Sequence, residues 1–244
     1  MNPIVIIPAR MAATRLPDKP LADIGGVPMI VRAMRQARAA NVGPVVVAAG
    51  DQAIVDVIEA AGGNAILTDP DLPSGTDRVR AALDIYDPDR IHDVIINLQG
   101  DMPFVGPDIL TAATALFAAR PDLQMGTLIA PEDSPADRAN PDVVKAVVAL
   151  AHGATQGRCL YFTRSTLYGD GPVWRHIGLY GYRRGGLEAM AAAPSPLEQR
   201  EKLEQLRALE LGVDIWAAIV DAPPLSVDNP RDLEAARAHA GSLS

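Results

Sequence analysis

The sequence lacks several features that would assign it to other classes of protein. It has one cysteine, Cys159, so no disulfide can form within the chain, and we expect a small buried side chain in a reducing compartment. No segment reaches the roughly 18 apolar residues that a membrane span needs, and the start MNPIVIIPAR has neither the basic segment nor the apolar length of a signal peptide. We therefore expect a cytoplasmic protein with no membrane insertion.

Positive charge and aromatic side chains are also scarce. The chain has 22 Lys and Arg against 30 Asp and Glu, a net charge of −8, and aromatic residues make up 4% of it. Proteins that bind nucleic acids usually carry excess positive charge, and those that bind single strands also need stacking platforms. The composition therefore argues against a nucleic-acid partner and is typical of a globular enzyme or binding domain.

Short apolar segments alternate with Ala-rich amphipathic ones along the first half of the chain. This alternation is typical of an α/β fold in which helices cover both faces of a mostly parallel sheet. The segment from about 121 to 183 differs, because it is strand-like with little helix between the strands, and a helix is predicted again over 197–212. We expect one domain, 1–244, with an antiparallel extension at about 121–212. The predicted strands include 3–9, 44–50, 64–68 and 93–101, and the predicted helices include 28–41, 52–63, 74–86 and 107–121.

Three cations, Arg10, Arg15 and Lys19, follow the first predicted strand within ten residues. Residues 1–35 carry five cations and two acids, a local balance of +3 within an acidic chain. Ligands of open α/β sheets bind at the carboxyl ends of the strands, where these cations lie. The loop contains neither GxGxxG nor GxxxxGK[ST], so the common dinucleotide and P-loop patterns are excluded. The alternatives are a solvated charged loop and a grip on one compact polyanion, such as a triphosphate.

The same loop carries a resemblance to a known family. PARMAATRLPDKPLADIGGVPMI resembles the signature of the 3-deoxy-manno-octulosonate (Kdo) cytidylyltransferases, or CMP-Kdo synthetases. Further blocks follow in the order of that family: SGTDR (74–78), NLQGDMP (97–103), NPDVVKAV (140–147), LYFTRS (160–165), RHIGLYGYR (175–183), PSPLEQREKLEQLR (194–207) and SVDNPRDLE (226–234). The resemblance implies a Rossmann-like nucleotidyltransferase fold, a homodimer, and transfer of CMP from CTP to Kdo, with release of pyrophosphate, for lipopolysaccharide biosynthesis.

The resemblance also implies roles for residues on the nucleotide side. Arg15, Lys19, Asp101 and Asp228 are the expected catalytic residues, and the two aspartates are expected to bind Mg²⁺. Taken alone, Asp101 also fits a turn or cap, Asp228 fits a helix N-cap, and Ser74 fits a plain cap. The expected nucleotide-binding residues are Arg10, Thr14, Arg15, Lys19, Ser74, Gly75 and Gln99.

A second group of residues is implied for the sugar. On the predicted helix 197–212, Leu203, Leu206 and Leu209 are the packing positions, so Glu204 and Gln205 point elsewhere. His176 taken alone also fits a buried structural histidine, and Tyr180 a core residue. The expected sugar-binding residues are Gln99, Arg164, His176, Tyr180, Glu204 and Gln205.

Three rival hypotheses stay open at this point. The segments VVVAAGD, GDMP and VDNP depart from the commonest family pattern, which leaves room for a close Kdo analogue, such as an amino-substituted one, as the sugar. Another nucleotidyltransferase of the same fold, acting on a different sugar acid or on a sugar phosphate, is a second possibility. A nucleotide-binding protein without catalysis is the third, and the presence of Asp101 and Asp228 argues against it.

Overall fold

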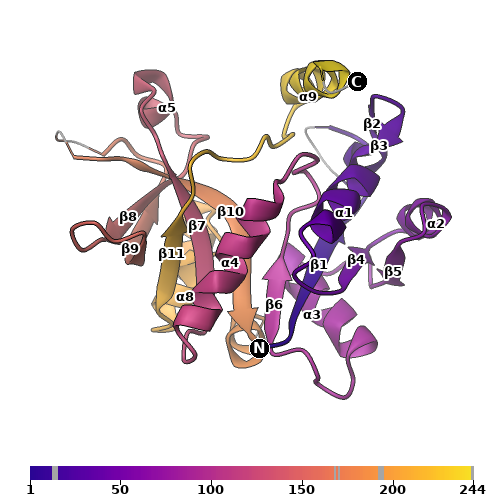
Figure 1. Ribbon diagram of the computed structural model, residues 1–244, viewed down its shortest axis with the longest axis horizontal. Coiled ribbons are helices and arrows are strands. Elements are labelled where there is room, and N and C mark those ends of the chain that lie inside the picture. The colour runs from indigo at the N-terminus through magenta and orange to yellow at the C-terminus, as the bar shows by residue number, and fades with distance from the viewer. Residues whose placement is uncertain (13–15, 168, 170, 192–194, 243–244) are drawn as a thin grey trace. The chain divides into compact units, whose positions relative to one another are not determined.

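The computed structural model describes residues 1–12, 16–167, 169, 171–191 and 195–242 (Figure 1). The chain divides into two compact units. The first, here called the parallel-sheet unit, comprises Asn2–Thr111 and Pro224–Ser244; the second, the ring unit, comprises Met1 and Ala112–Pro223 and contains the predicted extension. Among the described residues, no helix has the length and apolar character needed to cross a membrane.

Four parallel strands form the sheet of the first unit, in the order β5-β4-β1-β6. Strand β1 lies centrally, with Val5 opposite Val45 of β4 and Ile4 opposite Ile95 of β6. Strands β1, β4 and β6 are largely buried apolar runs because both faces of a parallel sheet are covered, whereas β5 at the edge is partly exposed. The strands are β1 (Pro3–Ala9), β4 (Val45–Ala49), β5 (Asn64–Leu67) and β6 (Val94–Asn97).

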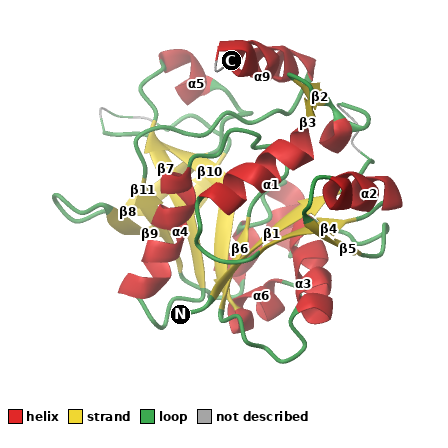
Figure 2. Ribbon diagram, turned by 45° about the vertical axis from the view of Figure 1, so that its right-hand side comes forward, coloured by secondary structure: helices red, strands yellow, loops and turns green. Residues whose placement is uncertain are grey.

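Helices cover both faces of this sheet. Figure 2 shows α1 and α2 above the strands and α3 below them. The chain runs outward from β1 through β4 to β5 and then returns to place β6 on the other side of β1, so the strand order reverses between β1 and β6. A reversal of this kind is where open α/β sheets bind their ligands. The helices are α1 (Met29–Ala39), α2 (Gln52–Ala60) and α3 (Gly75–Tyr86).

The last helix of the chain, α9 (Pro230–Ser242), returns to the parallel-sheet unit. It packs beside the small hairpin of β2 (Asp23–Ile24) and β3 (Val27–Pro28), as Figure 1 shows. A shared apolar cluster joins residues more than 190 positions apart, and this packing brings Asp228 to the loop after β1. The cluster comprises Ile24, Met29, Val227, Leu233, Ala236 and Ala240.

Five strands of the second unit are joined by hydrogen-bonded pairing into a closed ring. Their order is β10-β7-β11-β9-β8, and β8 pairs again with β10 through Trp174–Ala146 and Arg175–Lys145. The β7–β11 pair is parallel, and the other pairs of the ring are antiparallel. The strands are β7 (Met125–Pro131), β8 (Lys145–Ala149), β9 (Gln156–Thr163), β10 (Trp174–Arg183) and β11 (Ile215–Ile219).

Most predicted elements are confirmed, and the exceptions are found in both units. Ser74 caps α3 by accepting a hydrogen bond from the Asp77 backbone, and Cys159 is buried, with burial raising the pKa of its thiol to about 12. The short helices η1 (Lys19–Leu21), α5 (Pro135–Ala139) and α6 (Arg184–Met190) were not predicted. Helix α4 (Pro107–Ala119) matches its prediction.

The single helix predicted over 197–212 is wrong. The structure has two helices there, α7 (Pro196–Glu201) and α8 (Leu206–Glu210), because Lys202 adopts a left-handed conformation with φ of 57° and ends the first. Glu204 and Gln205 therefore lie in the turn between two helices and not on the polar face of one. Leu203 and Leu206 are buried as predicted.

Candidate active site

A pocket opens at the carboxyl edge of the parallel sheet, where the strand order reverses. Its volume is about 250 Å³. Five of the nucleotide-binding residues predicted from the sequence line this pocket. Arg10 and Lys19 come from the loop after β1, and Ser74, Gly75 and Gln99 come from other segments of the same unit. The other two, Thr14 and Arg15, lie outside the described residues. The lining residues are Pro8, Ala9, Arg10, Ala12, Lys19, Pro20, Met29, Leu72, Ser74, Gly75, Arg78, Gln99, Gly100 and Asp101.

Lys19 joins the two predicted metal ligands. Its Nζ lies 2.8 Å from Asp101 Oδ2 and 3.5 Å from Asp228 Oδ1. The backbone also brings the two acids together, since the Val227 N–H donates to the Asp101 carbonyl at 2.9 Å. Asp228 does not cap α9, because Asn229 accepts the hydrogen bond from the Asp232 backbone. The sequence thus identified two acids that the fold does bring to one cation.

The surroundings of Asp101 disfavour the charged form of its carboxyl. Burial raises the pKa of its carboxyl, Lys19 opposes that effect, and the nearby Asp228 adds to it. A carboxylate in this state favours the approach of additional positive charge. Two aspartates fit Mg²⁺ that is bound mainly through substrate phosphates, since such sites use one or two protein carboxylates. Among the described residues, no group of three or more His, Cys, Asp or Glu is placed to hold a metal ion.

Two further side chains that were not predicted as site residues shape the pocket. Arg78 is 2% exposed and donates to Thr68 Oγ1 and to the carbonyls of Asp69 and Pro70. Desolvation and the neighbouring Arg10 lower the pKa of its guanidinium. Asp51 fixes the start of the cationic loop by accepting from the Met11 N–H at 2.8 Å. Arg78 lies within the motif SGTDR, which was a signal available in the sequence.

Gly50 makes room for the two arginines of this site. A Cβ at Gly50 would lie 2.8 Å from Arg78 Nη1 and 3.1 Å from Arg10 Cβ, closer than side chains pack. The Gly50 N–H also donates to the Ala9 carbonyl, which ties the loop after β4 to the end of β1. The close approach of the two arginine side chains to the Gly50 backbone thus depends on the absence of a side chain here.

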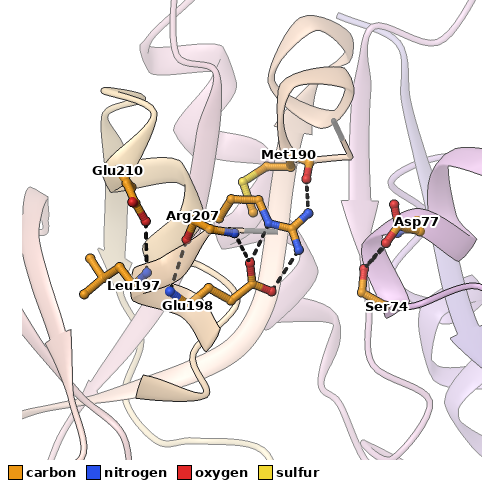
Figure 3. A network of polar contacts seen from close by, with 8 residues as sticks. Ser74, Asp77, Met190, Leu197, Glu198, Arg207 and Glu210 are labelled. Atoms are coloured by element: carbon orange, nitrogen blue, oxygen red, sulfur yellow. Dashed lines mark hydrogen bonds and ion pairs between the residues drawn. The ribbon is translucent and has the colours of Figure 1, made fainter. Parts of the chain in front are cut away.

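Ser74 and Gln99 have internal partners as well as a place on the pocket wall. The Ser74 hydroxyl donates to Asp77 Oδ2 at 2.7 Å, and the Asp77 N–H donates back to it (Figure 3). Gln99 Nε2 donates to the buried Asn97 side chain at 3.1 Å. The capping role of Ser74 is therefore present, and its position in the pocket is compatible with the nucleotide contact expected from the resemblance.

In the ring unit, three of the predicted sugar residues form one hydrogen-bonded and stacked cluster. Tyr180 donates from its hydroxyl to Gln205 Oε1 at 3.0 Å, and the rings of His176 and Tyr180 lie 5.5 Å apart. Burial lowers the pKa of His176 to about 3 and raises that of Tyr180 well above its usual value, so both side chains are neutral at pH 7. The cluster is an uncharged hydrogen-bonding surface.

Two buried polar atoms next to this cluster have no protein partner among the described residues. They are Gln205 Nε2, a donor, and Glu204 Oε1, an acceptor. Buried polar atoms are normally hydrogen-bonded, so these two atoms have hydrogen-bonding capacity left for water or for a polar ligand. Arg164 has other contacts: it donates to the carbonyls of Pro141 and Lys202 at 3.0 and 3.4 Å.

A buried ion pair holds the turn that carries Glu204 and Gln205. Arg207 donates through two nitrogens to both carboxylate oxygens of Glu198, at 2.7 and 2.8 Å, and through Nη1 to the Met190 carbonyl (Figure 3). Glu198 also completes a capping box with Ser195 at the start of α7. Leu197 donates its N–H to Glu210, which links α7 to the end of α8. Sequence reasoning missed Arg207, although it lies in a quoted motif.

Comparison with known proteins gives a consistent result. The sequence profile of the cytidylyltransferase family matches residues 4–215. A curated protein of Rhodospirillum rubrum, named 3-deoxy-manno-octulosonate cytidylyltransferase, is 56% identical over 98% of this chain and 96% of its own length. One of the same name from Parvibaculum lavamentivorans is 56% identical over 97% of this chain and 92% of its own length. The chain belongs to the 3-deoxy-manno-octulosonate cytidylyltransferase family.

The fold agrees with this membership. A solved structure described as CMP:2-keto-3-deoxy-manno-octonic acid synthetase complexed with CTP matches with a TM-score of 0.89 at 36% identity, covering 100% of both chains. A nucleotidyltransferase from Methanothermobacter thermautotrophicus is 13% identical with a TM-score of 0.63, covering 100% of this chain and 99% of its own, which shows a shared fold alone. The predicted fold class and family are confirmed.

Proposed function

We propose that this protein transfers CMP from CTP to Kdo, giving CMP-Kdo and pyrophosphate. The observation that carries the proposal is the 56% identity, over almost the full length, to a protein named for that reaction. The local chemistry supports it. One unit offers a pocket with cations and a pair of carboxylates, and the other offers a neutral cluster with unpaired polar atoms.

The cationic pocket suits the nucleotide half of the reaction. In this reaction the anomeric hydroxyl of the sugar attacks the α-phosphorus, a P–O bond forms as the bond to pyrophosphate breaks, and the hydroxyl proton is released. Such a step depends mainly on alignment and on neutralising charge on the phosphates. Arg10 and Lys19 line the pocket and carry fixed positive charge for that purpose, and Arg15 stays a predicted third cation.

Asp101 and Asp228 would hold Mg²⁺ in this pocket. The ion would supply positive charge against the phosphates during transfer. In the protein alone, Lys19 provides the positive charge between the two acids. The same lysine is therefore placed to contact both the carboxylates and a phosphate bound beside them, which links nucleotide binding to the arrangement of the acids.

The neutral cluster suits the sugar half. Kdo carries several hydroxyls, and each can donate and accept a hydrogen bond. Gln205 Nε2 offers a donor and Glu204 Oε1 an acceptor to such a ligand. Gln99 and Arg164 stay predicted sugar-binding residues, with Arg164 as the cation for the sugar carboxylate.

A substrate panel tests the proposal directly. Pyrophosphate release and the nucleotide-sugar product are measured with Mg²⁺ and CTP against ATP, GTP and UTP, and with Kdo against an amino-substituted Kdo and sialic acid. We expect CMP-Kdo from CTP and Kdo. No product from that pair would contradict the proposal. Faster turnover of the amino-substituted sugar would favour the alternative, activation of a Kdo analogue.

Three broader predictions accompany this function. We propose that the enzyme is a homodimer, acts in the cytoplasm and supplies CMP-Kdo for lipopolysaccharide synthesis. These statements rest on the resemblance to the family and, for the compartment, on the composition of the chain. Light scattering of the purified protein tests the first, and cell fractionation tests the second. Depletion of the protein, followed by analysis of the lipopolysaccharide, tests the third.

A further inference from the structure

An irregularity in β10 lies opposite one buried threonine. Pairing of β10 with β7 shifts between Ile177 and Tyr180, so that Tyr180, and not residue 178 or 179, faces Thr127. Thr127 is 1% exposed. Its hydroxyl lies 2.9 Å from the Leu179 carbonyl, 3.2 Å from the Ile177 carbonyl and 3.0 Å from His176 Nε2. One hydroxyl thus contacts both the irregular backbone and the histidine ring.

The hydrogen-bonding capacity of these groups fixes where the protons lie. A hydroxyl has one hydrogen to donate, and a carbonyl only accepts. If the Thr127 hydroxyl donates to the Leu179 or Ile177 carbonyl, its lone pairs face His176, and Nε2 must carry a hydrogen. If the hydroxyl instead donated to Nε2, no hydrogen would lie between its oxygen and the two carbonyl oxygens at 2.9 and 3.2 Å, and these close oxygen–oxygen contacts would be repulsive.

Because His176 is neutral, the direction of its hydrogen bond with Thr127 determines which ring nitrogen can accept a hydrogen bond. The ring lies edge-on to Phe162 at 4.8 Å and is held in a buried setting that lowers its pKa to about 3, so it is neutral at pH 7. A neutral imidazole has one N–H and one acceptor nitrogen. With the hydrogen on Nε2, the acceptor is Nδ1, and among the described residues Thr127 is the hydrogen-bond partner of the ring.

We propose that Thr127 is a positioning residue that holds His176 in the Nε2–H tautomer, so that Nδ1 accepts a hydrogen bond from a hydroxyl of the bound sugar acid. The inference rests on the proposed function, because it takes the His176 cluster as the sugar site. It adds a residue to that site which does not itself touch the sugar. It also assigns complementary roles, in which His176 accepts from the sugar while Gln205 Nε2 donates to it.

The tautomer is measured by long-range ¹H–¹⁵N correlation spectra of ¹⁵N-histidine-labelled protein. A His176→Gln variant identifies the signals of His176. In the wild type we expect a protonated Nε2 and an unprotonated Nδ1. A protonated Nδ1 in the wild type overturns the proposal without any variant or substrate.

Two variants then test the link from Thr127 to the sugar. Thr127→Val keeps the shape and removes the hydroxyl, and Thr127→Ser restores it. We expect Val to lose the pure Nε2–H tautomer and to raise the KM for Kdo by about 5- to 10-fold, the size of one neutral hydrogen bond, with the Kd for CTP unchanged. Ser should return both readouts toward the wild type.

The outcomes separate the possible failures. A raised KM with an unchanged tautomer means that Thr127 acts only through packing, and this contradicts the proposal. An unchanged KM with an altered tautomer contradicts the role of Nδ1. Wild-type protein that makes no CMP-Kdo overturns the proposed function, while the spectra still decide whether Thr127 sets the tautomer. If Thr127→Val fails to fold, the wild-type and Thr127→Ser spectra decide the question.

Discussion

Lys19 in the parallel-sheet unit and Arg207 in the ring unit are both cations held by carboxylates, but their surroundings differ. The Lys19 side chain is 18% exposed, lines a pocket and is shared between two acids. The Arg207 side chain is 4% exposed and is saturated by Glu198 and a backbone carbonyl. The first unit therefore presents charge to a ligand. The second uses charge internally and presents neutral groups, His176 and Tyr180, at its candidate site.

The largest effect is expected at the carboxylates of the pocket. Asp101→Asn should reduce turnover by at least about 10³-fold, because the change removes a predicted metal ligand at the α-phosphate. Since burial disfavours the charged form of Asp101, the neutral amide should not lower the melting temperature. Steady-state kinetics and thermal melts measure the two effects. Asp84→Asn, an exposed acid on α3, is the matched control, and normal turnover in Asp101→Asn would remove that residue from the metal site.

Breaking the ion pair between Arg207 and Glu198 should lower the stability of the fold more than it weakens substrate binding. Arg207→Ala leaves Glu198 buried without its partner and should destabilise the protein by about 3 kcal/mol, which lowers the melting temperature by roughly 6–12 °C. Arg158→Ala, which breaks an exposed pair with Asp214, should cost less than about 1 kcal/mol. Thermal melts compare the two variants. Equal, small shifts would mean that Arg207 does not brace the turn between α7 and α8.

Removing Lys19, which is shared between two aspartates, should weaken CTP binding more than it lowers the stability of the fold. Lys19→Ala should weaken CTP binding by about 2.5 kcal/mol, the scale of a hydrogen bond to a charged group, and the loss should be larger at low salt. Titration calorimetry at two salt concentrations measures this, with the exposed Arg35→Ala as control.

Tyr180→Phe in the ring unit should behave differently from Lys19→Ala, since the effect of Tyr180→Phe on the KM for Kdo should not depend on salt. A salt-independent loss in Lys19→Ala would contradict the electrostatic account.

The neutral histidine should make the folded state sensitive to acid. Its pKa is about 3 in the folded protein and about 6.5 when unfolded, so between these values the unfolded chain binds more protons. Stability from this group is present above pH 6.5 and is lost as the pH falls toward 3, about 2 kcal/mol of it by pH 5. Denaturant titrations at pH 5 and 8 measure this. His176→Asn should reduce the difference, and an equal difference in both proteins would contradict the buried neutral state.

Local sequence signals predicted the parallel sheet well. The apolar run 3–9, the cap at Ser74 and the cations after β1 each depend on neighbours within a few positions, and each is found as expected where it is described. The acids Asp101 and Asp228 came from the family resemblance, not from local pattern. Their meeting at Lys19 depends on packing of α9 against β2, which joins residues more than 190 positions apart.

The ring unit was harder to predict because its key features depend on backbone conformation. LEQREKLEQLRALELG has the periodicity of one helix, yet Lys202 adopts a left-handed conformation that is rare for residues other than glycine. The irregularity opposite Thr127 likewise depends on how two strands meet. No local pattern marks Arg207 as buried, because its partner Glu198 lies nine residues away across that break.

The closed ring of strands in the ring unit affects where aggregation can begin at high protein concentration. Each of the five strands of the ring unit has a hydrogen-bonding partner on both sides, whereas β5 of the other unit, among the described strands, pairs with β4 alone. Unpaired strand edges are where chains add to one another during aggregation. The ring offers little such edge, and β5 is only four residues long. Intermolecular strand addition, where it occurs, should therefore begin at Asn64–Leu67.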